Sequence, residues 1–163
     1  MICGVAYVAQ GFDESTFYTR NTDSFDPRAE FIFEGVGGDE KIGDFGLTGN
    51  GAAGMEIDAI NYDLGTPPNA LVLASSHNHT PAYLLVLDEM LFNIMDSGGD
   101  VCEQVRADMV FFETPGGGAV FSVGSIAWSG ALSHNGYDNN VSLITGNVLK
   151  RFCQEEPFVF EPR

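Results

Sequence analysis

The stretch RADMVFFETPGGGAVFSVGSIAW, residues 106–128, contains the clearest secondary-structure signal of the chain. Two apolar runs, DMVFFE (108–113) and AVFSVG (119–124), flank a Pro-Gly-Gly-Gly turn. Apolar runs rich in β-branched and aromatic residues and separated by a glycine-rich turn are typical of a β-hairpin. The sequence therefore predicts an antiparallel hairpin over 108–124, in which Glu113 fixes the turn and has no catalytic role.

A polar loop and an amphipathic helix follow the hairpin. The loop SHNGYDNN spans residues 133–140, and the run NNVSLITGNVLKRF spans residues 139–152. One stripe of this run is apolar, as expected of a helix that packs on a core. Its members are Val141, Ile144, Val148 and Phe152. Asp138 or Asn139 is expected to cap the helix, and two basic residues fall in its last turn, where they are favourable.

Four further runs have the composition of strands. They are ICGVAYVA (2–9), EFIFEGV (30–36), MEIDAI (55–60) and ALVLASS (70–76). The last run is continuously apolar, which is typical of a strand buried on both faces. Strands and helices in this order predict an α/β layered fold with an antiparallel hairpin near the C-terminus. We expect one domain over residues 1–163, with a peripheral tail at 154–163.

Residues 83–95 fit two patterns. Apolar residues recur there at mixed spacings of three and four, which predicts a helix ended by Gly98. The residues concerned are Leu84, Leu87, Leu91 and Ile94. Leu84 and Val86 also alternate with their neighbours, so a strand that begins at Tyr83 is an open alternative.

Glycine is dense between residues 35 and 54. This density is unfavourable inside a helix or a strand, and it predicts a long shaped loop. The sequence GNGAAG (49–54) has some similarity to a dinucleotide-binding fingerprint. A Rossmann phosphate loop needs a strand before it and a helix after it, whereas MEIDAI (55–60) has strand spacing. We therefore reject a nucleotide-binding loop.

The composition excludes several classes of partner. Of the 163 residues, 23 are acidic and 7 are basic, giving a formal net charge of −16 and a pI near 4.1. Such a surface repels nucleic acid and anionic lipid. The acidic residues are scattered, so we assign them to solubility. No apolar segment reaches the about 20 residues that span a bilayer, and no basic region begins a secretory signal, so a cytoplasmic protein is expected.

The residues alone provide neither a nucleophile nor a strong metal motif. Cys3, Cys102 and Cys153 lie in no CxxC or CxxH spacing and are expected to be small buried apolar residues. None lies on the strained turn that a glutaminase cysteine requires, and no serine forms a G-x-S-x-G motif, so both chemistries are excluded. His77 and His79 could share one strand face, but a polar loop explains them as well, and we predict no metal site.

Four long blocks carry a family resemblance. They are GFDESTFYTRNTDSFDPRAEFIFEGVG (11–37), GDFGLTGNGAAGMEID (43–58), LGTPPNALVLASSHNHT (64–80) and RADMVFFETPGGGAVFSVGSIAWSGALSHNGYDNNVSLITGNVLKRF (106–152). Over these blocks the chain resembles the C-terminal domain of the N,N-dimethylformamidase large (beta) subunit family. The match runs from about Gly4 to Phe152, and its last block is the most distinctive.

The resemblance implies a fold, an activity and a set of partners. The fold is a glutamine-amidotransferase-like, flavodoxin-like layered sheet at the end of a longer polypeptide. The activity is hydrolysis of the C–N bond of a small formamide, which gives formate and an amine. The family holds iron with two tyrosines and a glutamate, expected upstream of this segment, so no cofactor is predicted for this chain alone. The implied partners are the remaining domains or subunits of such an enzyme and a small amide substrate.

Three residues are candidates for the catalytic site within this resemblance. Glu56 follows several glycines, which allow the backbone to approach a small pocket closely. His134 and Asn135 lie between the hairpin and the last helix, where open α/β folds commonly bind ligands. Without the resemblance, Glu56 would be a solvent-facing acid, Asn135 and Gly136 would make a turn, and His134 would bond locally.

Two functions from different classes are left open. The chain is either the C-terminal domain of such an amidohydrolase, inactive alone, or a non-catalytic binding or structural module on the same scaffold. Two tyrosines converging with a glutamate would indicate a complete metal site. The tyrosines are Tyr7, Tyr18, Tyr62, Tyr83 and Tyr137. A domain separated from its neighbours exposes an apolar face, so self-association into a homo-oligomer is a further expectation.

Overall fold

The strands of this protein form two sheets. The structure is a computed structural model that describes residues 2–87, 90–91 and 96–160. The first sheet has the spatial order β3 (Glu56–Ala59), β1 (Ala6–Gln10), β5 (Leu84–Leu87), β6 (Met90–Leu91). The second has the order β2 (Tyr18–Arg20), β4 (Leu71–Ser76), β7 (Asp108–Glu113), β8 (Ala119–Ser122). Every strand pairing within the described ranges is antiparallel.

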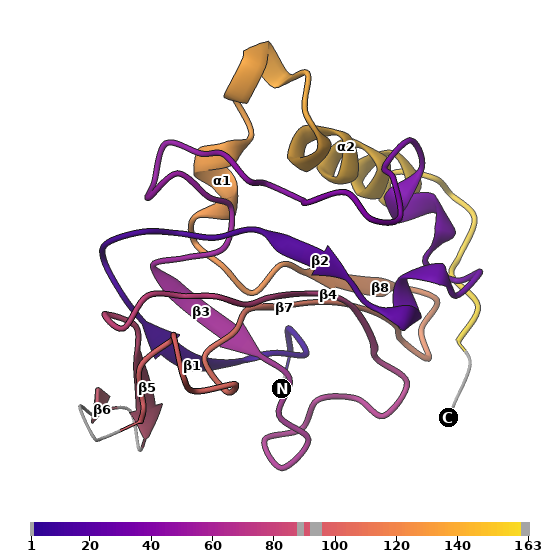
Figure 1. Cartoon of the computed structure of the whole chain (residues 1–163). Coiled ribbons are helices and arrows are strands. Elements are labelled where there is room, and N and C mark those ends of the chain that lie inside the picture. Colours follow the sequence, from indigo (N-terminus) through magenta and orange to yellow (C-terminus); the bar gives the residue numbers. More distant parts are fainter. Residues whose placement is uncertain (1, 88–89, 92–95, 161–163) are drawn as a thin grey trace.

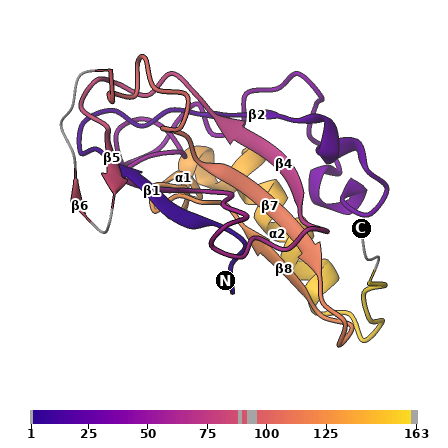
Figure 2. The same ribbon diagram turned by 90° about the horizontal axis from the view of Figure 1, so that it is seen from below.

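Helices cover one side of the second sheet. Figure 1 shows α1 (Trp128–Ala131) and α2 (Asn140–Phe152) above β2, β4, β7 and β8, and Figure 2 shows α2 behind the same strands. Three short 3-10 helices complete the described elements: η1 (Thr22–Phe25), η2 (Glu30–Phe33) and η3 (His134–Tyr137). The architecture is thus mixed α/β. A flavodoxin-like sheet is built largely on parallel strands, so the amidotransferase-like architecture stays a prediction.

The predicted hairpin and the predicted last helix are both confirmed. In the hairpin, Val110 pairs with Ser122 and Glu113 pairs with Ala119, and every residue of β7 is buried. In α2, the stripe residues Val141, Ile144 and Val148 are buried against the core, while Phe152 lies at its margin and contacts Phe158 of the tail. The strands predicted from MEIDAI and ALVLASS are present as β3 and β4, and residues 35–54 contain no regular helix or strand.

The strand predicted over 30–36 is wrong. Residues Glu30–Phe33 form the 3-10 helix η2, after turn bonds from the Ala29 amide to the Asp26 carbonyl and from the Ile32 amide to the Ala29 carbonyl. Ile32 and Phe33 are consecutive and both buried, which the alternation of a half-buried strand does not allow. This segment packs against α2, and the Asn147 side chain donates to the Ile32 carbonyl.

The helix predicted to end at Gly98 is also wrong where the structure describes it. Residues 84–87 form β5, and Leu85 pairs with Ala9 of β1, so the alternative of a strand near Tyr83 is confirmed. Ile94 lies outside the described residues. The period-two pattern prevails because Tyr83 and Leu85 are buried, whereas Leu84 and Val86 are only partly buried.

Two smaller expectations need correction. The first strand begins at Ala6 and not at Ile2, because Gly4 has a left-handed φ of 78° and lies against Phe112, where a Cβ would come within 2.7 Å of the ring. Cys3 and Cys153 are exposed and not buried, and Cys102 is half-buried. Among the helices of the described ranges, none is long and apolar enough to cross a membrane.

A short segment after β8 joins the two sheets. Ser125 forms an antiparallel bridge with Ile57 of β3. The Asp58 amide donates to the Gly124 carbonyl over 2.9 Å, and the Ile126 amide donates to the Glu56 carbonyl over 3.3 Å. Residues 124–126 therefore continue the line of β8 onto the edge of the first sheet.

Candidate functional site

Glu56 lies on an exposed face of the first sheet beside two residues of β1. In the antiparallel ladder Gln10 lies opposite Glu56, and Tyr7 lies opposite Asp58. Tyr7 and Gln10 are three residues apart, which in a regular strand would direct their side chains to opposite faces. The register of β1 shifts between Tyr7 and Ala9, and this bulge brings both side chains to the same face.

These four residues form a connected polar group, which we call the β1–β3 cluster: Tyr7, Gln10, Glu56 and Asp58. The Tyr7 hydroxyl donates to Gln10 Oε1 over 2.9 Å, and Gln10 Nε2 lies 3.5 Å from Glu56 Oε1. Burial and then the charge of Glu56 raise the pKa of Asp58. Burial and then the charges of Glu56 and Asp58 raise the pKa of Tyr7. The cluster therefore places one carboxyl that retains its proton more readily beside a second, exposed carboxylate.

A groove of about 530 Å³ runs beside the cluster, and Tyr7 is part of its wall. Most of the other lining residues are apolar: Ala6, Val8, Ala59, Ile60, Leu64, Leu85, Val86 and Leu87. Binding sites for small molecules are commonly apolar hollows of this size with a few polar groups at one side. The arrangement suits a small, mostly apolar molecule with one polar end.

His134 and Asn135 are exposed in η3, and their contacts are local. The His134 ring stacks on Phe45 with ring centres 4.1 Å apart, and Asn135 Nδ2 donates to the Asp138 carbonyl over 3.1 Å. Asn135 has φ 49° and Gly136 has φ 65°, so the predicted turn is confirmed. The predicted cap is Asn139, whose Oδ1 accepts from the Ser142 amide.

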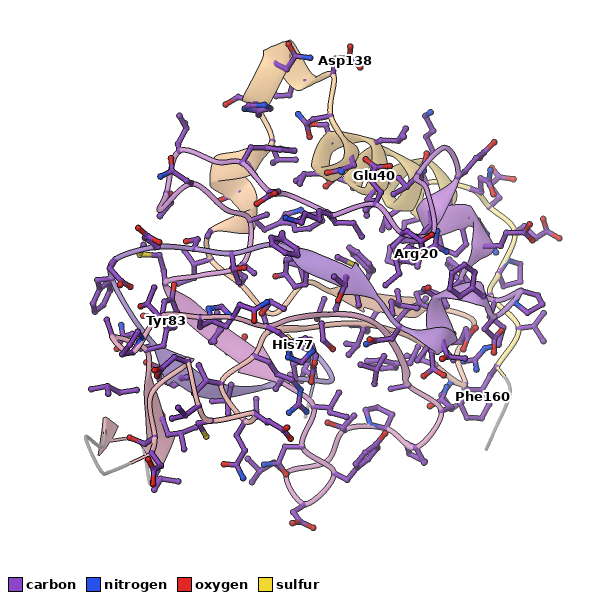
Figure 3. All side chains as sticks on the ribbon, viewed as in Figure 1. Arg20, Glu40, His77, Tyr83, Asp138 and Phe160 are labelled. Atoms are coloured by element: carbon purple, nitrogen blue, oxygen red, sulfur yellow. The ribbon has the colours of Figure 1, made fainter. Side chains whose placement is uncertain are left out.

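The structure does not bring Glu56 together with His134 and Asn135. In Figure 1 the segment η3 lies at the top of the molecule, above α1, whereas β3 lies below α1; Figure 3 labels Asp138 at the same top end. A hollow of about 690 Å³ beside this loop is lined by Tyr137, Asp138 and the start of α2, but not by His134 or Asn135. The catalytic roles of all three residues stay predictions.

His77 and His79 do not share a strand face. β4 ends at Ser76, and Asn78, with φ 61°, turns the chain between the two histidines. His77 is exposed, while His79 is only 2 % exposed and its Nε2 lies 2.7 Å from Ser76 Oγ. Burial, followed by the neighbouring His77, lowers the pKa of His79 to about 4. Its Nδ1 has no hydrogen-bond partner within the ranges that the structure describes.

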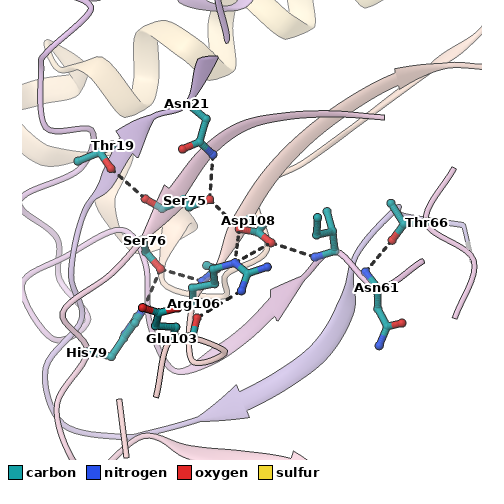
Figure 4. A network of polar contacts seen from close by, with 12 residues as sticks. Thr19, Asn21, Asn61, Thr66, Ser75, Ser76, His79, Glu103, Arg106 and Asp108 are labelled. Atoms are coloured by element: carbon teal, nitrogen blue, oxygen red, sulfur yellow. Dashed lines mark hydrogen bonds and ion pairs between the residues drawn. The ribbon is translucent and has the colours of Figure 1, made fainter. Parts of the chain in front are cut away.

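A buried carboxylate network lies next to this histidine (Figure 4). Asp108, fully buried at the start of β7, accepts hydrogen bonds from Ser75 Oγ over 2.7 Å, from Arg106 Nε over 3.0 Å and from the Ile60 amide over 3.0 Å. Its partners come from β4, from the segment before β7 and from the residue after β3. Each carboxylate oxygen is bonded, so we assign Asp108 to holding the two sheets together.

The hydroxyl groups of the buried tyrosines have separate partners. Tyr18 Oη donates to the Val123 carbonyl over 2.6 Å, and Tyr83 Oη accepts from the Met55 amide over 3.0 Å. Tyr7 bonds to Gln10. Within residues 2–87, 90–91 and 96–160, no group of three or more His, Cys, Asp or Glu is arranged to hold a metal ion. The hydroxyls of Tyr7, Tyr18 and Tyr83 are thus each bonded to a different partner, and the iron that the resemblance implies stays a prediction for other parts of the enzyme.

Sequence reasoning found Glu56 but missed its neighbours. Tyr7 and Asp58 lie in the two segments predicted as strands, and pairing those strands would have placed them together. The bulge that turns Tyr7 and Gln10 to one face gives no signal in the sequence.

The comparisons with known proteins agree on one family. The family described as "N,N-dimethylformamidase beta subunit-like, C-terminal" matches residues 1–139. The N,N-dimethylformamidase beta subunit of Paracoccus aminophilus is 46% identical over 156 residues, and that of Alcaligenes sp. is 45% identical over 156 residues. Each alignment covers 96% of this chain and 20% of the relative, so the chain spans about a fifth of the length of these relatives. The resemblance drawn from the four sequence blocks is confirmed.

Proposed function

We propose that this chain, which belongs to the family of N,N-dimethylformamidase beta subunit-like C-terminal domains, forms one wall of the active site of an amidohydrolase. The observation that carries the proposal is the position of Glu56. It is exposed on the β1–β3 cluster, beside a second carboxyl and an apolar groove of about 530 Å³. The remaining parts of the site belong to other domains or subunits of a dimethylformamidase-like enzyme, and the chain alone is inactive.

The proposed reaction is hydrolysis of a small formamide such as N,N-dimethylformamide. The Glu56 carboxylate takes a proton from water as the water oxygen adds to the formyl carbon. The same proton then passes to the amide nitrogen as the C–N bond breaks, giving formate and dimethylamine. The raised pKa of Asp58 favours a proton on this neighbouring carboxyl, which reduces the repulsion around Glu56. The apolar groove suits the methyl groups of the amide.

No step of this proposal passes through iron, whose ligands the resemblance implies to lie outside this chain. We place those ligands in the other parts of the enzyme. His134 and Asn135 lie apart from Glu56, so any catalytic role of theirs needs those parts to bring a second surface. The amidotransferase-like architecture, the cytoplasmic location and the homo-oligomer are kept as predictions.

A non-catalytic module is the second candidate function. The specific observation in its favour is that the hydroxyls of Tyr7, Tyr18 and Tyr83 bond to three different partners. In this alternative the chain contributes binding surface and stability, and the chemistry belongs entirely to other parts of the enzyme.

A chimaera tests the proposal against this alternative. The matching fifth of the Paracoccus aminophilus beta subunit is replaced by this chain, produced with any partner subunit, and assayed for dimethylamine released from N,N-dimethylformamide. The chimaera should be active, and Glu56→Gln should lower kcat by about 100-fold or more, the usual size of a lost general base. Glu155→Gln, an exposed acid in the tail, is the matched control and should leave kcat unchanged.

Three outcomes would contradict the proposal. A chimaera that assembles but has no activity would show that this chain does not form a working active site with the rest of the enzyme. Full activity of the Glu56→Gln variant would support the alternative in which this chain is a non-catalytic module. Hydrolysis of formamides at an enzymatic rate by the isolated chain, or stoichiometric iron in it by elemental analysis, overturns the division of roles between this chain and the rest.

A further inference from the structure

The residue directly before Glu56 has an unusual backbone conformation. Met55 has φ 66°, in the left-handed region that residues with a side chain rarely adopt. Both of its backbone polar groups are bonded to other segments. The Met55 amide donates to Tyr83 Oη over 3.0 Å, and the Met55 carbonyl accepts from the Gly11 amide over 3.0 Å. The left-handed turn is thus held by Tyr83, the residue before β5, on one side and by Gly11, the residue after β1, on the other.

Tyr83 is built tightly into this turn. Its side chain is fully buried, and two glycines, Gly11 and Gly54, lie against it. A Cβ at Gly11 would come within 2.5 Å of the Tyr83 ring, and a Cβ at Gly54 would come within 2.7 Å of Tyr83 Oη. Only glycine allows this approach of backbone to ring. The hydroxyl can therefore reach the Met55 amide, and little space is left for the ring to move away.

Ser125 fixes the other side of the same turn. The Gly54 amide donates to Ser125 Oγ over 2.8 Å, and Ser125 Oγ donates to the Gly54 carbonyl over 3.1 Å. Both backbone polar groups of Gly54 are thus bonded to one hydroxyl. The Glu56 carbonyl accepts from the Ile126 amide. These hydrogen bonds hold residues 54–56 through their backbone, whereas the Glu56 side chain itself is exposed.

We infer that Tyr83 is a positioning residue, whose hydroxyl holds Met55 in the left-handed conformation and thereby fixes the direction of the Glu56 side chain within the β1–β3 cluster. This inference rests on the proposed function of Glu56. If the hydroxyl is lost, the Met55 amide is left buried without its acceptor, and the extended conformation becomes favourable. A change of φ at residue 55 redirects the side chain at residue 56, and small misplacements of a catalytic group lower rates strongly.

The test uses Tyr83→Phe in the chimaera described above, which keeps the ring and removes the hydroxyl. We expect kcat to fall about tenfold or more while KM for N,N-dimethylformamide changes less than about twofold. Ser75→Ala is the matched control, because it also removes a buried hydroxyl bond, to Asp108, far from Met55 in the hydrogen-bond network. It should lower Tm without changing kcat.

A second substitution provides a rescue that a general loss of stability would not produce. Asparagine tolerates left-handed φ values better than methionine. Met55→Asn alone should therefore leave kcat unchanged, and Met55→Asn combined with Tyr83→Phe should recover most of the lost kcat. If Tyr83→Phe does not assemble, Ser125→Ala is measured in its place, with the same expected loss of kcat.

The outcomes separate this inference from the proposed function. An unchanged kcat for Tyr83→Phe, or for Ser125→Ala where that variant is used, overturns the positioning role if Glu56→Gln is inactive. The absence of any rescue by Met55→Asn overturns it as well. Full activity of Glu56→Gln instead overturns the proposed function on which the inference rests.

Discussion

Lowering the pH should destabilise this protein through His79. Its side chain is 2 % exposed, and burial, followed by the neighbouring His77, lowers its pKa from 6.5 to about 4. In the unfolded chain the imidazole takes up a proton near pH 6.5, whereas in the folded protein it does so only near pH 4. Between these values the unfolded state binds more protons, so the free energy of unfolding falls as the pH falls.

The size of the effect follows from the two pKa values. A full loss corresponds to about 3 kcal/mol, because each pH unit of difference is worth about 1.4 kcal/mol. By pH 4.5 the loss should reach about 2.5 kcal/mol. Asp58 acts in the opposite direction, since its raised pKa lets the folded state take up its proton first. The contribution of His79 is therefore measured as a difference between the protein and a variant.

The variant is His79→Gln, whose amide can take the place of Nε2 beside Ser76 Oγ but does not titrate in this range. Urea unfolding of both proteins is followed by the fluorescence of Trp128, the single tryptophan, from about pH 7.5 to pH 4.5. The unsubstituted protein should lose about 2.5 kcal/mol more than the variant across this range. His77→Gln, at an exposed position, should keep the steep pH dependence. Equal slopes for the protein and His79→Gln would refute the reasoning.

Three further substitutions test the packing. Glu113→Gln should lower the free energy of unfolding by about 3 kcal/mol in urea denaturation, because it breaks a buried pair in which Arg28 Nε donates to Glu113 Oε1; a loss under about 1 kcal/mol would contradict this. Asn139→Ala should cost about 1 kcal/mol through the lost cap of α2, and an unchanged Tm would show that the cap is not needed. Ile144→Ala should cost about 3 kcal/mol by leaving a cavity beneath α2, and a cost no larger than that of the exposed Leu149→Ala would be inconsistent with its burial.

Local sequence patterns predicted the elements whose cause is local. The hairpin follows from two apolar runs around a glycine turn, and α2 follows from a stripe of period 3.6 with a polar cap. The strand prediction is wrong for residues 30–33 because this segment packs against α2, more than a hundred residues away in the sequence. One contact between them is the 3.2 Å hydrogen bond from Asn147 to the Ile32 carbonyl. For residues 84–87 the sequence leaves a helix and a strand both open, because the choice between them depends on pairing with β1.

The candidate site could be predicted only in part. Glu56 was identified as an acid on a half-exposed strand, and its exposure agrees with that expectation. Its neighbours depend on the register between β1 and β3 and on one bulge. The left-handed turn at Met55 depends on the hydroxyl of Tyr83, which lies directly before a third strand, β5. Features of this kind depend on which distant segments pack against each other, and a single amino-acid sequence contains no direct signal for such contacts.

The bridge between residues 124–126 and β3 also bears on how the molecule opens. Because Gly124 and Ile126 share backbone hydrogen bonds with Asp58 and Glu56, the edge of the first sheet is tied to the hairpin whose first strand, β7, is buried along its whole length. The amide protons of β3 and β8 should then exchange with solvent in one cooperative opening. The strand that carries Glu56 would in this way have the protection of the core, although the Glu56 side chain itself is exposed.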